Sequence, residues 1–205
     1  MNLSRRRFVS YAGAAAAFLG APASALRAQT TRPSTPSMTE GPFYPEAFSA
    51  TPLSNLVRGK LMGDAVPLAL GGRITDRFGK PLAGARVEIW QCDGLGHYTH
   101  SRDSTPDDRD ANFAGFGWVT ADADGRYAFS TIRPVPYPGR TPHIHVAVKQ
   151  AKSRPFVTQM FIDGVAQNQR DGLYRNMSVA ERALLTVKLQ ADPAGQSASF
   201  DLVLT

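Results

Sequence analysis

The sequence predicts an all-β fold, specifically an antiparallel β-sandwich with long loops and at most one short helix. From Leu68 onward, short segments rich in β-branched and aromatic residues alternate with clusters of glycine, proline and aspartate. Two of these clusters, 78–84 and 122–125, have the length of hairpin connections. Because tight hairpins join antiparallel strands, this pattern favours paired strands over strands joined by helical crossovers.

Eight segments are predicted to be strands: 68–76, 86–92, 116–121, 127–132, 143–149, 156–162, 184–191 and 199–204. The one helix candidate starts at Ser178, which forms a capping box with Glu181 ahead of an apolar pair. Trp90 and Trp118 fall at strand positions, so we expect both rings to belong to the core rather than to a stacking surface.

Residues 1–28 have the pattern of a twin-arginine export signal. The motif Ser4-Arg-Arg-Arg-Phe-Val9 is followed by a mildly apolar run, 11–19, and by a zone of small residues suited to cleavage. The apolar run is too short to span a bilayer, which takes about 20 predominantly apolar residues. We therefore expect the Tat export machinery as a partner, a periplasmic or secreted mature protein, and no stable membrane insertion after cleavage.

The rest of the chain divides into a short linker and one domain. Residues 29–38 lack apolar periodicity and are predicted to be a linker in which nothing packs. Residues 39–205 contain no internal repeat or domain boundary, and their number suits a single domain that can bury a proper core.

Charge and cysteine content narrow the classes of partner. Residues 1–28 contain four arginines and no acidic residue, so their removal lowers the formal net charge from +6 to +2. No cluster of basic residues interleaved with aromatics follows, and nucleic-acid binding is therefore not expected. Cys92 is the only cysteine, which excludes an intrachain disulfide, and it is predicted to be a buried small apolar group.

The segment around residues 137–149 predicts a metal site. His143 and His145 are two residues apart in a segment suited to a strand, so both imidazoles should point to the same face. Pro142 cannot lie inside a central strand, and it therefore places Tyr137 and Arg140 in the loop that leads into the strand. Taken alone, this pattern is more typical of a satisfied surface pair of histidines or of a pair of zinc ligands than of a mononuclear iron site.

The other two histidines, His97 and His100, flank Tyr98 and leave two sets of ligands open. A site made only of histidines would suit zinc. A mixed site would use Tyr98 and Tyr137 as phenolates beside the histidine pair, and two hard anionic oxygens favour Fe(III) over Zn(II).

The loop 93–115 is long and polar, and loops of this length are usually functional or mobile. It carries Asp103, Asp107, Asp108 and Asp110, with two arginines among them. Aspartates mixed with arginines favour a solvated, salt-bridged loop over a second metal site. We expect it to be a lid or a subunit contact.

Five stretches of the chain carry motifs in a fixed order: Thr39-Glu-Gly-Pro-Phe-Tyr44, Gly72–Gln91, Gly94-Leu-Gly-His-Tyr-Thr-His100, Thr131–Tyr137 with Arg140 and His143-Ile-His145, and Thr158-Gln-Met-Phe161. Together they resemble the intradiol ring-cleavage dioxygenases and are similar to the subunits of protocatechuate 3,4-dioxygenase. The resemblance implies an enzyme that cleaves a catechol-type ring between its two hydroxylated carbons with O2, giving a muconate-type diacid.

The resemblance also implies a role for individual residues. Iron, as Fe(3+), would be held by Tyr98, Tyr137, His143 and His145. Tyr137 would be the ligand that leaves the metal and takes a substrate proton. Arg140 would support negative charge on the substrate, and Gln159 would orient Arg140.

The chain departs from the family in two places. Only five residues separate Tyr137 from His143, fewer than in protocatechuate enzymes, which implies a more open pocket and leaves the choice of catechol undetermined. Residues 29–66 contain no amphipathic stretch like the helical dimerisation segment of catechol 1,2-dioxygenases. One chain carries all four ligands, so a hetero-oligomer is not required, a homo-oligomer is compatible with the sequence, and the oligomeric state is left open.

Two other functions remain open at this point. A periplasmic transthyretin-like or carboxypeptidase-regulatory-like binding module would account for Gly72–Trp90 without any iron. A zinc hydrolase using all four histidines would need a general base, for which the sequence has no convincing position.

Overall fold

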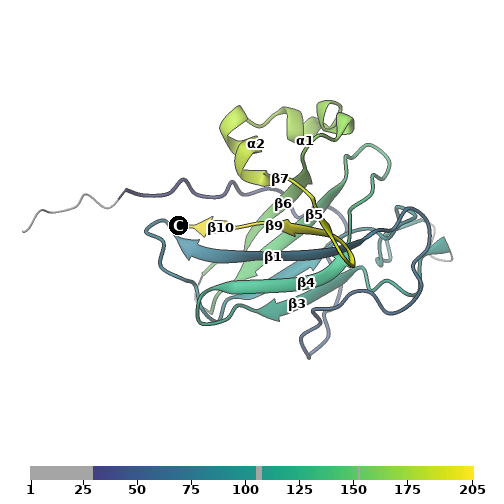
Figure 1. The fold of residues 1–205 in the computed structure, drawn as a ribbon, viewed down its shortest axis with the longest axis horizontal. Coiled ribbons are helices and arrows are strands. Elements are labelled where there is room, and N and C mark those ends of the chain that lie inside the picture. The colour runs from purple at the N-terminus through teal and green to yellow at the C-terminus, as the bar shows by residue number, and fades with distance from the viewer. Residues whose placement is uncertain (1–29, 105–107, 152) are drawn as a thin grey trace, which may run out of the picture.

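The computed structural model describes residues 30–104, 108–151 and 153–205. The export signal predicted at 1–28 lies outside these residues. Two five-stranded sheets pack face to face (Figure 1). One sheet contains β1 (Pro67–Asp76), β4 (Arg126–Ile132), β8 (Gln190–Asp192), β9 (Gly195–Ser199) and β10 (Leu202–Leu204). The other contains β2 (Arg86–Trp90), β3 (Phe116–Thr120), β5 (His143–Lys149), β6 (Phe156–Ile162) and β7 (Thr186–Val187).

The all-β sandwich is confirmed, and both of its sheets are mixed. In the first sheet β1 pairs antiparallel with β4 on one side and parallel with β9 and β10 on the other. In the second sheet the order is β3-β2-β5-β6-β7, with β6 and β7 parallel and all other pairs antiparallel. The hairpins predicted at 78–84 and 122–125 are wrong, because these turns join β1 to β2 and β3 to β4, and each crosses from one sheet to the other. Turn signals carry no information on which strands pair across the fold.

The bounds predicted for the last two strands are wrong. Leu184 and Leu185 end the helix α2 (Val179–Leu185), so the predicted strand 184–191 divides into the end of α2, β7 and β8. The predicted strand 199–204 is interrupted, because the carboxylate of Asp201 accepts a hydrogen bond from the Arg73 N–H that a continuous ladder would pair with a backbone carbonyl.

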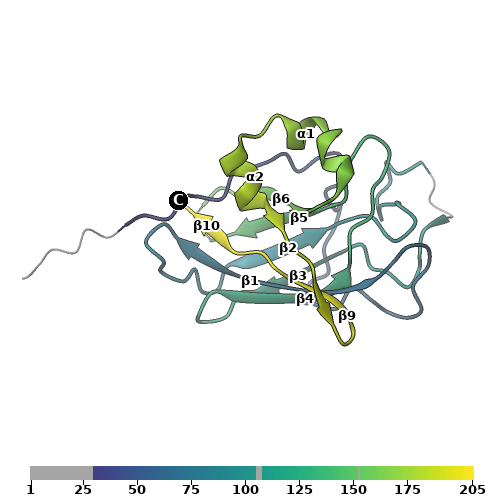
Figure 2. The same ribbon diagram turned by 45° about the horizontal axis from the view of Figure 1, so that its top comes forward.

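The helices lie together against one edge of the second sheet, above β6 and β7 (Figure 2). The capping box of Ser178 and Glu181 is present at the start of α2, as predicted. Two further short elements accompany α2, namely the 3-10 helix η2 (Ala166–Gln169) and the four-residue helix α1 (Gly172–Arg175). Within the described part of the chain, no helix has the length and apolar character needed to cross a membrane.

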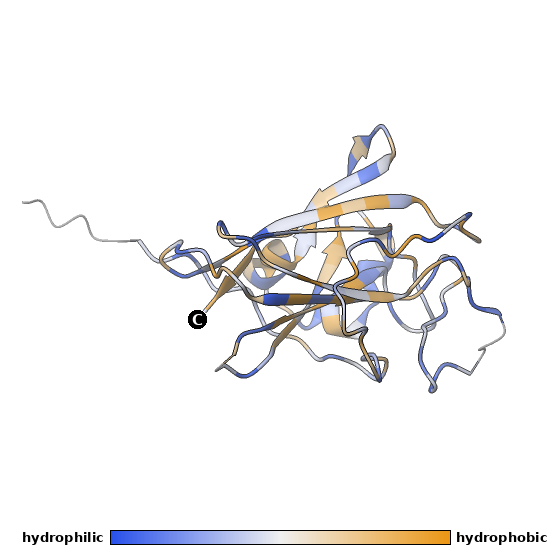
Figure 3. Ribbon diagram, turned by 90° about the horizontal axis from the view of Figure 1, so that it is seen from below, coloured by the Kyte–Doolittle hydropathy of each residue, from blue (hydrophilic) through white to orange (hydrophobic). Residues whose placement is uncertain are grey.

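The core lies between the sheets and is formed by alternate residues of the facing strands. It includes Leu70 and Ile74 of β1, Ile144 and Val146 of β5, and Met160 of β6. Figure 3 shows apolar residues running along the strands, whereas the loop between β2 and β3 is mostly hydrophilic. This contiguous apolar layer is the main source of stability of the sandwich.

Strand β5 differs from an ordinary sandwich strand because six of its seven residues are buried. Its alternate residues Ile144, Val146 and Val148 enter the core, while His143 and His145 point to the outer face. A second, smaller apolar cluster covers that outer face and includes Trp90, Cys92 and Tyr98. The site described below therefore lies outside the main core, on the covered outer face of the second sheet.

The segment 30–38 is irregular, but the prediction that nothing in it packs is wrong. Thr35 is buried and exchanges hydrogen bonds with Val203 of β10, donating its N–H to the carbonyl and accepting at Oγ1 from the amide. Met38 packs against the core and donates its N–H to the Val157 carbonyl. These contacts are long-range in sequence, so apolar periodicity within the segment could not reveal them.

Candidate functional site

Three side chains form a row across the outer face of the second sheet. Trp90 of β2 and Gln159 of β6 are the register partners of His145 on its two sides. The Trp90 ring stacks on the imidazole of His145, with centroids 4.8 Å apart and planes 9° apart. Trp90 is thus both buried and a stacking surface. Trp118 is only partly buried and lies under the Arg86 guanidinium, so its predicted core position is wrong.

The two imidazoles face each other through their Nε2 atoms, which are 3.1 Å apart. The Thr141 carbonyl accepts a hydrogen bond from Nδ1 of His143 at 2.6 Å, which leaves the Nε2 lone pair of that ring available. Burial lowers the pKa of His143 to about 4 and that of His145 well below its usual value. Both rings are therefore neutral near pH 7 and suited to bind a metal through nitrogen.

Tyr98 lies in the loop that follows β2, and its ring is stacked on Phe43 at a centroid distance of 4.5 Å. Its hydroxyl is buried without a hydrogen-bond partner among the described residues. The carboxylate of Asp103 accepts from the Tyr98 N–H and holds the loop backbone. Burial raises the pKa of the Tyr98 phenol well above its usual value, so its ionisation requires a cation close by.

Tyr137 completes the group of rings. Its centroid lies 5.3 Å from that of Tyr98 and 5.6 Å from that of His143, and Tyr98 in turn lies 6.5 Å from His145. Burial raises the pKa of Tyr137, and the charge of Arg140 opposes this shift. The structure thus brings the four predicted ligands together from one strand and two loops, and these side chains could hold a metal ion.

Arg140 and Gln159, the other two predicted site residues, contact each other directly. The Arg140 Nη2 donates to Oε1 of Gln159 at 2.6 Å, and Nε2 of Gln159 donates to the Thr39 carbonyl at 2.9 Å. Arg140 also forms an ion pair through Nε with Asp171 at 2.7 Å. The guanidinium is therefore held on two sides and has little freedom to leave the neighbourhood of Tyr137.

Tyr137 lies between two cavities. One, of about 480 Å³, is lined by residues that include Phe43, Leu95, Tyr98 and Tyr137. The other, of about 460 Å³, is lined by residues that include Tyr137, Arg140 and Asp171. The Tyr137 ring therefore borders both cavities, and charged side chains contribute to the lining of each.

Sequence reasoning missed several residues that shape the site. Gly41 has φ +71°, and a Cβ there would lie 3.4 Å from Cε1 of His145, so the backbone covers this ring closely. Phe43, in the same motif, packs on Tyr98. Asp171 precedes a glycine that starts α1, and an Asp at an N-cap is a signal that the sequence offered.

His97 and His100 do not join the histidine pair. His97 Nδ1 lies 3.7 Å from a carboxylate oxygen of Asp103, and His100 Nδ1 accepts from the Arg102 N–H. No group of three or more His, Cys, Asp or Glu in the described ranges is arranged to hold a metal ion. The interpretation as a zinc site built from four histidines is therefore wrong.

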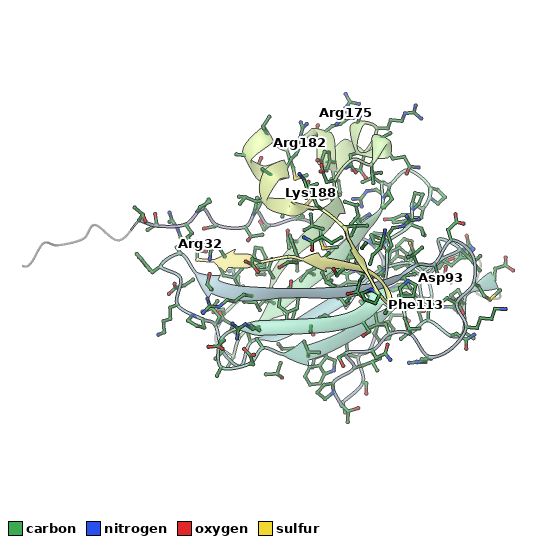
Figure 4. All side chains as sticks on the ribbon, viewed as in Figure 1. Arg32, Asp93, Phe113, Arg175, Arg182 and Lys188 are labelled. Carbon is green, nitrogen blue, oxygen red and sulfur yellow. The ribbon has the colours of Figure 1, made fainter. Side chains whose placement is uncertain are left out.

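The aspartates of the loop 93–115 brace its backbone. Asp110 is buried and accepts from the N–H groups of Met62 and Asn112, and it donates its own N–H to Asp93. Asp93 and Phe113, near the two ends of the loop, are labelled in Figure 4. The expectation of a solvated, salt-bridged loop is thus wrong for Asp110; Asp107 lies outside the described residues.

Comparison with known proteins identifies relatives over most of the domain. A family model described as Dioxygenase matches residues 39–205. The protocatechuate 3,4-dioxygenase beta chain of Burkholderia cepacia is 33% identical over 159 residues, which cover 71% of this chain and 66% of that protein. A hydroxyquinol 1,2-dioxygenase of Corynebacterium glutamicum is 31% identical over 152 residues, covering 65% and 48%. This chain thus spans about half to two thirds of the length of these relatives.

Solved structures agree with this assignment. The dioxygenase domain of a dioxygenase carbohydrate-binding protein fusion from Streptomyces sp. SirexAA-E superimposes with a TM-score of 0.68 at 31% identity, covering 84% of this chain and 98% of that chain. A catechol 1,2-dioxygenase from an Acinetobacter species gives a TM-score of 0.62 at 27% identity, covering 83% and 62%. An intradiol ring-cleavage dioxygenase from Tetranychus urticae shares the fold, with a TM-score of 0.68 at 23% identity, covering 84% and 94%.

Proposed function

Because this chain belongs to the intradiol ring-cleavage dioxygenase family, we propose that it cleaves the aromatic ring of a catechol-type substrate between the two hydroxylated carbons. O2 is the second substrate and a muconate-type diacid is the product. The observation that carries the proposal is the convergence of two phenols and two neutral imidazoles beside a held guanidinium. The relatives are named as dioxygenases, so a non-catalytic binding module is not favoured.

The family implies iron, and the donor set suits Fe(III). Two imidazole nitrogens 3.1 Å apart and a buried phenol without a partner form an incomplete polar set that a cation would satisfy. Tyr98, Tyr137, His143 and His145 are its proposed ligands. Bound Fe(III) would act as a Lewis acid that accepts both catechol oxygens and makes the ring reactive towards O2.

Tyr137 is proposed to take a proton from the substrate. It is less buried than Tyr98 and borders both cavities, so it is the phenol that a substrate meets. As a phenolate, Tyr137 would be a base of sufficient strength for a catechol hydroxyl. Tyr98 is held by its stack on Phe43 and has no comparable freedom.

Arg140 is proposed to stabilise negative charge that develops on the substrate ring. Its guanidinium is always charged, and the bonds to Gln159 and Asp171 hold it beside Tyr137 before the reaction starts. A donor that is already in place costs no reorganisation when charge develops, which is the main reason such groups accelerate reactions.

The test combines metal analysis with product analysis. Protein purified without chelator should contain iron, and with catechol under air it should consume one O2 per ring and yield the ring-opened diacid, detected by mass spectrometry. Catechol, hydroxyquinol and protocatechuate should be compared, because the short loop before His143 leaves the choice among them open. Zinc or no metal, together with no ring-opened product after ferric loading, would refute the proposal.

We also propose export by the twin-arginine route, on the motif at residues 4–9. A double substitution of Arg5 and Arg6 to lysine should retain the protein inside the cell, as measured by fractionation. Equal export of the substituted and natural chains would refute this route.

A further inference from the structure

Arg140 lies in a long irregular loop and not in a strand, so no strand pairing fixes the position of its side chain. The loop 133–142 connects β4 to β5 and contains Gly139 at φ +80°. Within the loop, the Arg140 N–H donates to the Tyr137 carbonyl, which forms a tight turn but sets no position for the side chain. A group outside the loop must therefore define where the guanidinium points.

Two such groups are present, namely Gln159 of β6, described above, and the carboxylate of Asp171, which is fully buried. Its Oδ2 accepts from Nε of Arg140 at 2.7 Å and from the N–H of Thr141 at 3.0 Å. Its Oδ1 accepts from the N–H groups of Leu173 and Tyr174 and caps α1. Each carboxylate oxygen thus serves a different element, and the buried charge is fully paired.

The hydrogen bonds of Asp171 also lead, through Thr141, to His143, one of the proposed ligands. Thr141, whose N–H is bound by Asp171, offers its carbonyl to Nδ1 of His143 and its hydroxyl to Oδ1 of Asn168 in η2. Two consecutive loop residues are therefore bound from these short helices. Asp171, the N-cap of α1, binds Arg140 and Thr141, and Asn168 of η2 binds Thr141. The guanidinium is held by Asp171, whereas Thr141, whose carbonyl accepts from His143, is also held by Asn168.

We propose that Asp171 is a positioning residue for the reaction. It fixes the Arg140 guanidinium beside Tyr137 by holding Nε, while Gln159 holds Nη2. Its link to Thr141 keeps the loop in register with β5. This inference rests on the proposed function, since Asp171 acts through Arg140 and touches neither of the two phenols in the contacts above.

Asp171→Ser separates positioning from simple helix capping. Serine is a good N-cap and keeps one acceptor for α1, but its hydroxyl is too short to reach Arg140 as well and carries no charge. We expect kcat to fall about 10- to 100-fold, as is typical when a group that orients a site residue is removed. Iron content and the visible band should stay near those of the natural protein.

A double-mutant cycle with Arg140→Ala tests whether Asp171 works through Arg140. The double variant Asp171→Ser/Arg140→Ala should be no slower than Arg140→Ala alone, within about twofold, because the group to be positioned is already gone. Losses in kcat that multiply, or a single variant within about twofold of the natural kcat, would overturn the proposal.

The matched control is Ser178→Ala, which removes the N-cap of α2, whose hydrogen bonds are made to Glu181 and not to the loop that carries Arg140. It should lower the melting temperature without changing kcat. If it reduces kcat as much as Asp171→Ser does, the effect reflects helix stability and the proposal fails. Should Asp171→Ser not fold, Asp171→Asn keeps the size of the side chain and enters the same cycle.

Thermal unfolding of the four proteins of the double-mutant cycle gives a readout that does not depend on activity. These are the natural protein, the two single variants and the double variant. The shifts in melting temperature of Asp171→Ser and Arg140→Ala should be less than additive in the double variant, since the two side chains form one partly buried ion pair. Additive shifts would refute the pair. Absence of any ring cleavage by the natural protein would refute the proposed function, and the unfolding cycle would still decide the pairing.

Discussion

Tyr98 and Tyr137 are the same side chain in two different surroundings. Tyr98 is 2% exposed and stacked on Phe43, whereas Tyr137 is partly exposed at the border of two cavities. Burial raises the pKa of both phenols, but the Arg140 charge opposes this rise at Tyr137. The buried phenol suits a permanent ligand, and the accessible one suits a group that moves.

Replacing each tyrosine by phenylalanine should therefore produce different defects. Tyr98→Phe should lose iron and the phenolate-to-iron band. Tyr137→Phe should keep most of its iron, bind catechol slowly and turn over poorly, because the base for a substrate proton is missing. The measurement is iron stoichiometry with anaerobic stopped-flow binding of catechol. Equal loss of iron in both variants, with natural binding rates in Tyr137→Phe, would contradict this division of roles.

Arg140→Ala should keep iron and colour but reduce kcat by about 100- to 1,000-fold, since only electrostatic support at the site is removed. Steady-state kinetics and the visible spectrum measure the two effects. Arg170→Ala is the matched control, because Arg170 lines the same cavity but is exposed. An unchanged kcat in Arg140→Ala would remove this residue from the mechanism.

At the scale of elements, β5 explains why the site is rigid. Its inward residues belong to the main core, and its outward residues His143 and His145 share one backbone with them. Antiparallel strands hold it on both sides, with β6 paired to residues 143–148 and β2 paired to residues 145–149. The loops bring Tyr98 and Tyr137 to a fixed pair of imidazoles, so only the loops need to adjust when a substrate binds.

The segment 30–38 acts as an extra partner for β10, and Thr35→Ala should reveal this. Removing Oγ1 leaves the buried Val203 N–H without its acceptor, which should lower the free energy of unfolding by about 1–3 kcal/mol. Denaturant titration of metal-loaded protein measures the change. Ser37→Ala, at an exposed position of the same segment, should be nearly neutral. Similar values for the two variants would mean that this segment does not contribute.

At the scale of the molecule, the core and the site are separate clusters. The main core contains the inward residues of both sheets, whereas Trp90, Cys92 and Tyr98 belong to the second cluster on the outer face. Removing the metal should therefore lower the melting temperature without unfolding the sandwich. Circular dichroism of chelated protein should retain the strand signal, and iron should restore the melting temperature. A chelated protein that is unfolded would contradict this separation.

The metal-free protein should also lose stability in acid over a defined range. The pKa of His143 falls from about 6.5 in an unfolded chain to about 4 in the folded protein because of burial. The unfolded state thus binds more protons between these values, and the stabilisation is complete above pH 6.5 and lost as the pH falls to 4. The loss from this residue is about 3 kcal/mol. His143→Gln, measured by denaturant titration, should have a flatter profile; an identical slope would refute the assignment.

Local sequence signals were sufficient to predict the two strands that carry His143, His145 and Gln159. His143–Lys149 and Phe156–Ile162 match the predicted bounds, because strand periodicity and flanking prolines are local signals. The motifs also identified Tyr98, Tyr137, Arg140 and Gln159 as members of one group, and the structure brings them together.

The long-range contacts could not be predicted from the sequence and became visible in the folded molecule. The packing of Thr35 against Val203, the parallel pairings of β1, the stack of Trp90 on His145 and the anchoring of Arg140 by Asp171 join residues far apart in the chain. Such contacts leave no periodicity in either partner, since each residue satisfies its local pattern whether or not the other is near. They are set by how the sheets and loops fold together, and for that reason only the assembled molecule reveals which carboxylate holds the arginine.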